Sequence, residues 1–198
     1  MKQYNNNLEY WKNRYDKMPG EKVVGNAMWT SEQYESEYAL WRMRIDPVLE
    51  GIKDSIHYVL DFGSGIGRWM GLLSKYCDYY YCCDIMKFNL PNFKQIKNNI
   101  IPFKNIKFDL IWACVTLQHV VDRSLLEYYL QQFYDLLNDN KYILIVENTS
   151  QNKNKNYLIF RSVEEYIKLF DKFKFTKVVI KKFISSGEEH SIILFKKG

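Results

Sequence analysis

Three closely spaced glycines and one later aspartate have the clearest chemical potential in this 198-residue chain. The glycines form Gly63-Ser64-Gly65-Ile66-Gly67, directly after the strand-like run 57–62 (HYVLDF). Glycine permits positive φ and lets a ligand contact the backbone, and the following helix start offers free N–H groups to an anion. Asp84 ends the next strand-like run, 78–84 (DYYYCCD). In a doubly wound sheet a carboxylate placed there binds ribose hydroxyls, so the combination predicts a site for a nucleoside-containing ligand.

The glycine spacing narrows the choice of ligand. Dinucleotide-binding loops have the pattern G-x-G-x-x-G, whereas this loop is G-x-G-x-G with Arg68 in the next position. The loop also lacks the lysine of a phosphate-binding P-loop. A nicotinamide dehydrogenase is therefore disfavoured. A tight strand–helix turn with a solvated Asp84 is the purely structural alternative.

The elements that must position these residues alternate between strand and helix, which predicts an α/β fold with a mostly parallel sheet. Expected helices are 31–49, 68–76, 123–138 and 163–173. Expected strands are 57–62, 78–84, a short one within 93–101, 108–114, 141–147, 174–184 and 190–196. The short Ser-Ser-Gly connection makes the last two strands antiparallel neighbours.

Local signals support several of these boundaries. Thr30 and Gln33 form a capping box at the start of the first predicted helix, and Ser162 is a helix N-cap. The segment 138–140 (Asn-Asp-Asn) is typical of a turn. One face of the first predicted helix is apolar, with Tyr34, Tyr38, Trp41 and Ile45 at helical spacing.

Composition excludes several classes of protein. No apolar run reaches the ~18 residues of a membrane span, and the first residues lack a secretory h-region, so we expect a cytoplasmic protein. The net charge of +5 comes from the segment 147–198, with 11 Lys/Arg against 6 Asp/Glu, which is too sparse to predict a nucleic-acid partner. The four cysteines, which have no zinc-binding spacing, predict reduced thiols and no metal site: Cys77, Cys82, Cys83 and Cys114.

With these motifs the chain resembles the class I S-adenosylmethionine-dependent methyltransferases. The resemblance covers roughly 55–197 and rests on Asp61-x-Gly63-x-Gly65-x-Gly67, Asp84, the segments 108–120 (FDLIWACVTLQHV) and 141–148 (KYILIVEN), and the final strand pair. It implies a Rossmann-like three-layer sandwich, with a seven-stranded, mostly parallel sheet that ends in an antiparallel C-terminal hairpin. It also implies an N-terminal helical lid over 1–54 and a cofactor-binding domain over 55–198.

The resemblance assigns the cofactor S-adenosylmethionine, with S-adenosylhomocysteine as product. Asp84 would bind the ribose diol, and Ile85 and Met86 would flank the adenine. Arg68 would pair with the methionine carboxylate, the anion of this cofactor. The family's usual Asp after the third strand is replaced by Asn98 and Asn99. The other expected cofactor-binding residues are Asp61, Gly63, Ser64, Gly65, Gly67, Asn99, Ile100 and Cys114.

Candidate catalytic residues follow the fourth and fifth predicted strands, on the ligand side of such sheets. His119 could accept a proton from a hydroxyl or ammonium group, and the alternative is a structural histidine. Glu147 is the second candidate, with Asn148 orienting the substrate; a helix-cap or loop role is the alternative. The first 61 residues contain Tyr and Trp but no Phe. Because Tyr and Trp each carry a polar group on an apolar ring, they suit the wall of a partly solvated pocket. Expected substrate-binding residues in this lid are Trp11, Arg14, Tyr15, Trp29 and Trp41.

These expectations combine into one function with two alternatives. The chain is expected to transfer a methyl group to an O or N atom of a small-molecule acceptor by in-line displacement, as a monomer or homodimer without a metal or a membrane. The string Gly-Ile-Gly-Arg, the Ile-Trp pair in 108–114 and His119 also resemble the protein α-N-terminal methyltransferases. A non-catalytic binding subunit that retains the methyltransferase fold is the other alternative.

Overall fold

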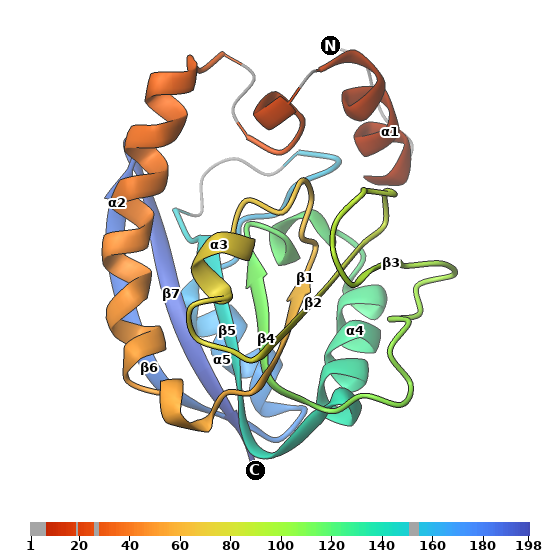
Figure 1. Ribbon diagram of the computed structural model, residues 1–198, viewed down its shortest axis with the longest axis vertical. Coiled ribbons are helices and arrows are strands. Elements are labelled where there is room, and N and C mark those ends of the chain that lie inside the picture. Colours follow the sequence, from red (N-terminus) through yellow and green to blue (C-terminus); the bar gives the residue numbers. More distant parts are fainter. Residues whose placement is uncertain (1–6, 19, 26–27, 151–154) are drawn as a thin grey trace.

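The protein is a three-layer α/β sandwich. Its structure, a computed structural model, describes residues 7–18, 20–25, 28–150 and 155–198 (Figure 1). Seven strands form one sheet in the order β3-β2-β1-β4-β5-β7-β6. Strands β1 to β5 are parallel, and β7 is antiparallel to both β5 and β6, which confirms the predicted topology. The strands are β1 (Tyr58–Phe62), β2 (Tyr79–Asp84), β3 (Phe93–Gln95), β4 (Phe108–Cys114), β5 (Leu137–Asn148), β6 (Phe175–Ser185) and β7 (Glu188–Lys197).

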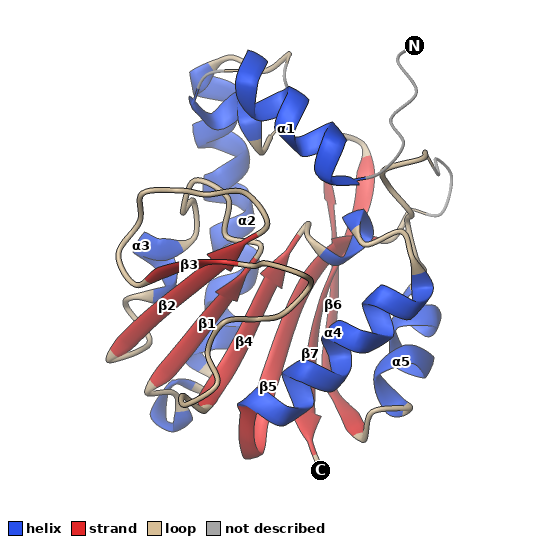
Figure 2. Cartoon of the chain, turned by 90° about the vertical axis from the view of Figure 1, so that its right-hand side faces the viewer, coloured by secondary structure: helices blue, strands red, loops and turns tan. Residues whose placement is uncertain are grey.

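Helices cover both faces of the sheet. The α-helices are α1 (Asn7–Lys17), α2 (Ser31–Glu50), α3 (Met70–Leu73), α4 (Arg123–Leu136) and α5 (Val163–Asp171), and short 3₁₀ turns are η1 (Gly20–Val23), η2 (Lys53–Ser55) and η3 (Leu117–His119). One core lies between the sheet and α4 and α5, and the other between the sheet and α2 and α3 (Figure 2). Neighbouring Cys82 and Cys83 belong to opposite cores, as their alternation along β2 requires.

The predicted helix caps are present. The Thr30 hydroxyl accepts a hydrogen bond from the Gln33 N–H at 3.3 Å, and the Gln33 side chain accepts one from the Thr30 N–H at 2.9 Å. Ser162 caps α5 in the same reciprocal way with Glu165. The predicted inner face of α2 is confirmed, because Tyr34 and Ile45 are buried and the two aromatic residues between them are half-buried. Helix α2 therefore packs its aromatic side toward the sheet.

Three local predictions were wrong or incomplete. The helix expected over 68–76 is regular only over Met70–Leu73. The turn expected at 138–140 is instead part of β5, with Asn140 at a φ of 61°. The carboxylate of Asp109 holds this polar stretch, accepting a hydrogen bond from Asn138 at 3.1 Å and pairing with Lys141 at 3.4 Å. Helix α1 was not predicted because the segment is polar and shows no clear apolar repeat.

The N-terminal elements lie above the carboxyl ends of the parallel strands. Figure 2 shows α1 across the points of these strands, with the upper part of α2 beside it. In the described part of the chain, no helix is both long and apolar enough to cross a membrane. The fold thus places the polar N-terminal segment over the edge of the sheet where ligands bind in doubly wound proteins.

Candidate active site

A large cavity opens at the carboxyl ends of β1, β2 and β4. Its volume is about 1430 Å³, and it is lined by the glycine loop, the end of β2, the loop after β4, and the N-terminal elements α1 and α2. Pockets for single small ligands measure roughly 300–1,000 Å³. The cavity therefore has room for a cofactor and a second ligand together.

The glycine loop is held in an unusual backbone conformation. Gly63 has a φ of +75°, and its N–H donates to the Cys83 carbonyl at 2.8 Å. A Cβ on Gly63 would lie 2.2 Å from the Thr116 methyl, and a Cβ on Gly65 would lie 2.6 Å from a Val24 methyl. Glycine is needed at both positions for conformation and for space. The Val24 contact brings the N-terminal lid directly against the loop.

Asp84 joins the end of β2 to this loop. One carboxylate oxygen accepts the Gly65 N–H at 3.0 Å, and the other accepts the Met86 N–H at 2.9 Å. Burial raises the pKa of Asp84 to about 6, and the hydrogen bonds from Met86 and Gly65 oppose this shift. Asp84 and Met86 both line the cavity, so the structure brings the predicted ribose and adenine residues together.

Arg68 presents an unsatisfied cation to the same cavity. Its guanidinium lies 5.2 Å from the centre of the Tyr34 ring. The Nη2 atom is buried and has no hydrogen-bond partner among the described residues. A buried charged donor without a partner is costly, and a ligand carboxylate would satisfy it.

The predicted cofactor residues divide into two groups. Those that line the cavity are Gly63, Ser64, Gly65, Arg68, Asp84, Ile85, Met86, Asn99 and Cys114. Asp61, Gly67 and Ile100 are not among the described residues that line it. Asp61 is buried beneath the loop, where it accepts a hydrogen bond from the Tyr80 hydroxyl at 2.7 Å and burial raises its pKa to about 7. Gly67 packs against Leu90, so both residues support the loop from behind.

His119 lies on the cavity wall in an aromatic setting. Its Nδ1 is 3.0 Å from the Tyr157 carbonyl oxygen, which can only accept, so Nδ1 carries the proton and Nε2 is left as an acceptor. The ring meets Trp11 edge-on at 4.9 Å, and it is parallel to the Tyr157 ring at 6.5 Å. Burial lowers the pKa of His119 to about 4, so the imidazole is neutral at pH 7.

Glu147 lies behind the loop that carries His119. Its carboxylate accepts hydrogen bonds from the backbone N–H groups of Thr116 at 3.0 Å, Leu117 at 2.8 Å and Gln118 at 3.2 Å. The side chain is fully buried, and burial raises its pKa to about 7. Glu147 was predicted to be a catalytic residue, with a helix-cap or loop role as the alternative. Its hydrogen bonds to the η3 turn favour the alternative, because the carboxylate fixes that turn.

Arg161 holds the same turn from the other side. It donates to the carbonyl oxygens of Leu117 at 3.0 Å and Val120 at 2.8 Å. Sequence reasoning missed Arg161 because its partners lie about 40 residues earlier in the chain. Asn148 also points elsewhere: its side chain donates to Glu188 and accepts from the Ser150 N–H at 3.0 Å. Asn148 is not among the described residues that line the cavity.

The predicted substrate residues of the lid all line the cavity: Trp11, Arg14, Tyr15, Trp29 and Trp41. Arg14, however, also braces the lid. It donates to the Lys22 carbonyl at 2.7 and 3.1 Å, to the Gly25 carbonyl, and to the Tyr10 hydroxyl at 2.8 Å. Tyr10 in turn stacks on Tyr157 at 3.9 Å, a contact that the sequence did not predict. The lid is thus tied both to itself and to the loop after β5.

Comparison with known proteins settles the family. The model of a family described as a methyltransferase domain matches residues 31–179. The chain belongs to this methyltransferase family. The family is a methyltransferase family, and the fold is the one found in class I S-adenosylmethionine-dependent methyltransferases, as the sequence motifs predicted. No curated protein matches the methyltransferase by sequence.

Solved structures share the fold of this methyltransferase. The N-methyltransferase NodS from Bradyrhizobium japonicum, in complex with S-adenosyl-L-homocysteine, is 12% identical with a TM-score of 0.68, over 97% of this chain and 99% of that chain. An S-adenosylmethionine-dependent methyltransferase from Clostridium acetobutylicum is 12% identical with a TM-score of 0.61, over 98% and 100%. One from Methanosarcina mazei is 15% identical with a TM-score of 0.63, over 76% and 97%.

Proposed function

We propose that the chain binds S-adenosylmethionine and transfers its methyl group to an O or N atom of a small-molecule acceptor. The observation that carries the proposal is the buried, unpartnered Nη2 of Arg68 in the same cavity as Asp84. The cavity therefore offers both a donor for a carboxylate and an acceptor for hydroxyls. This pair matches the two polar ends of the cofactor.

The residues present fit this cofactor. Arg68 would bind the methionine carboxylate, Asp84 the ribose hydroxyls, and Ile85 and Met86 the faces of the adenine. Asn99 lines the cavity, and its side chain can hydrogen-bond a base edge. When bound, the cofactor supplies an electrophilic methyl group on a sulfonium.

The remaining task of the chain is to position the acceptor. Methyl transfer gains most from holding the nucleophile in line, and correct placement of reactants supplies a large share of many rate accelerations. Nε2 of His119 is an acceptor on the cavity wall, so it would accept a hydrogen bond from an acceptor hydroxyl or amine. Because burial keeps the pKa of His119 near 4, the ring orients a neutral nucleophile and is a weak proton acceptor.

The N-terminal segment would act as the cover of this site. We assign residues 1–54 as the lid and substrate cap, and 55–198 as the cofactor-binding domain. The contact between Val24 and Gly65 and the stack between Tyr10 and Tyr157 support this division, because both join the lid to the cavity rim. A closed lid excludes water from the sulfonium and from the nucleophile.

The acceptor class is open to a direct test. NodS is described as an N-methyltransferase, which supports nitrogen among the possible acceptor atoms. A methyl-transfer screen would offer fractionated small-molecule extracts and N-terminal peptides, with S-adenosylhomocysteine release as readout. Turnover with an extract fraction supports the proposal. Turnover with peptides alone would replace it with the α-amine alternative, and cofactor binding without any turnover would favour a binding subunit.

A further inference from the structure

A second chemically distinct region lies in the same cavity, away from Asp84. We call it the Glu37 subsite; its residues, which all line the cavity, are Trp29, Glu37, Tyr38, Trp41, Trp69 and His190. Asp84 ends β2, whereas His190 lies on β7, four places further along the sheet. At about 4.8 Å between strands, this separation is roughly 19 Å. The His190 side of the subsite is thus too far from the ribose position to serve the same part of the ligand.

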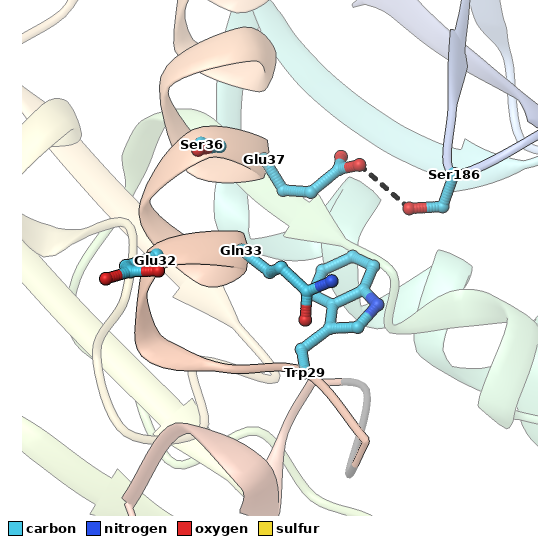
Figure 3. A pocket seen from close by; sticks show the side chains of 6 residues that line it. All are labelled: Trp29, Glu32, Gln33, Ser36, Glu37 and Ser186. Carbon is cyan, nitrogen blue, oxygen red and sulfur yellow. Dashed lines mark hydrogen bonds between the residues drawn. The ribbon is translucent and has the colours of Figure 1, made fainter.

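Glu37 is held by neutral donors alone. Its carboxylate accepts hydrogen bonds from the Trp41 indole N–H at 3.2 Å, from the Ser185 hydroxyl, and from the Ser186 hydroxyl at 2.8 Å. Figure 3 shows Glu37 extending from α2 toward Ser186, on the same side of the helix as Gln33. Within the described ranges, no Lys, Arg or His forms an ion pair with Glu37. The negative charge is oriented but not neutralised.

The cationic side chains near this subsite lie over aromatic rings and form no ion pair with Glu37 among the described residues. Arg42 lies over the Tyr38 ring at 5.5 Å, and Arg68 lies over Tyr34 at 5.2 Å. His190 donates from Nδ1 to the Glu188 carbonyl at 3.1 Å, and burial lowers its pKa, so its ring is neutral at pH 7. Glu37 therefore keeps a carboxylate that no cation among the described residues pairs with.

Aromatic rings cluster around Trp41, whose indole N–H donates to Glu37. The Trp41 ring centre is 6.2 Å from that of Trp69 and 4.7 Å from that of His190, and Tyr38 is 4.9 Å from Trp69. The faces of such rings attract cations, most strongly where water is partly excluded. Glu37 and Trp29 also line a shallow hollow of about 250 Å³, which shares these two residues with the main cavity (Figure 3).

We propose that the Glu37 subsite binds a positively charged ammonium group of the methyl acceptor, with Glu37 as its counter-ion. That the cation belongs to the methyl acceptor rests on the proposed function; the recognition of a cation by this subsite does not. The charged group would be remote from the atom that receives the methyl. The acceptor class is then a cationic amine that carries a separate O or N nucleophile.

The test compares probes of equal size and different charge. The full chain is titrated with benzylammonium, benzyl alcohol or benzoate, with and without S-adenosylhomocysteine, while the tryptophan indole N–H resonances are followed by NMR. We expect benzylammonium to bind at least tenfold more tightly than the other two, which corresponds to about 1.4 kcal/mol. Glu37→Gln should remove this preference. Glu35→Gln is the matched control, because Glu35 is exposed on the same helix and is not among the residues that line either hollow.

Each outcome decides a different question. Equal affinities for the three probes, no binding up to tens of millimolar, or a preference that survives Glu37→Gln would overturn the cation subsite. Binding of S-adenosylhomocysteine, recorded in the same samples, reports on the proposed function separately. Cation binding without cofactor binding would support the subsite and reject the methyltransferase activity. Cofactor binding without cation binding would support the proposed function and reject the subsite.

Discussion

The carboxylate of Asp84 accepts a hydrogen bond from the backbone N–H of Gly65, 3.0 Å away. This bond ties the end of β2 to the glycine loop that follows β1. The residue expected to bind the ribose therefore also fixes the loop that borders the cofactor. Because the same oxygens serve both tasks, loss of Asp84 removes a ligand contact and loosens the loop together.

Asp84→Ala should weaken the binding of S-adenosylhomocysteine by about 1–3 kcal/mol, the cost of losing hydrogen bonds to a charged acceptor. Isothermal titration calorimetry measures this directly. The matched control is Asp78→Ala at the approach to the same strand, where the carboxylate is exposed and contacts His57. An affinity unchanged by Asp84→Ala would refute the ribose role.

Arg68→Met tests the carboxylate partner with a pair of ligands. S-adenosylhomocysteine contains the carboxylate, whereas 5′-methylthioadenosine lacks it but keeps the adenosine. The variant should lose about 1.5–3 kcal/mol of affinity for the first ligand and almost none for the second. Arg42→Met, which removes the cation above Tyr38, controls for the loss of a nearby charge. Equal losses for the two ligands would show that Arg68 supports the loop and does not bind the carboxylate.

The parts of the site that the sequence predicted are those whose chemistry is local. The glycine loop and Asp84 follow strands directly, so their spacing alone places them at one edge of the sheet. Arg161 and Tyr157 could not be predicted, because their roles depend on contacts with η3 and His119 that only the folded chain creates. The place of Asn140 within β5 could not be predicted either, because a turn-forming sequence is held in this strand by contacts with the distant residue Asp109.

Glu147→Gln should reduce the free energy of unfolding by about 1–3 kcal/mol at pH 7, because an amide N–H₂ would face backbone N–H groups in a buried site. Burial raises the pKa of Glu147 to about 7 from its ordinary 4.5, so the folded state binds this proton more strongly than the unfolded state. The contribution of Glu147 to stability thus falls as pH rises from about 4.5 to 7. Urea unfolding should show the gap between wild type and variant narrowing over this range.

A matched surface variant sharpens that experiment. Glu164→Gln, at an exposed position in the first turn of α5, should leave the unfolding free energy close to that of the wild type. If Glu147→Gln were equally harmless at every pH, the carboxylate would not be holding the η3 turn.

His119 should show the opposite dependence on pH. Burial lowers its pKa to about 4 from 6.5, so between these values the unfolded chain binds a proton that the folded chain does not. Stability contributed by the neutral ring is therefore lost as pH falls from about 6.5 to 4. As the pH falls over this range, the unfolding free energy of His119→Asn should decrease less than that of the wild type. An NMR titration of the ring gives an independent check, and a midpoint near 6.5 would contradict the lowered pKa of this imidazole.

Binding of S-adenosylmethionine in this cavity underlies the proposed function, and calorimetric titration of the intact chain measures it. We expect saturable binding of both S-adenosylmethionine and S-adenosylhomocysteine with one site per chain. No measurable heat of binding with either ligand at high micromolar concentration, from folded protein, would show that the cavity does not bind this cofactor.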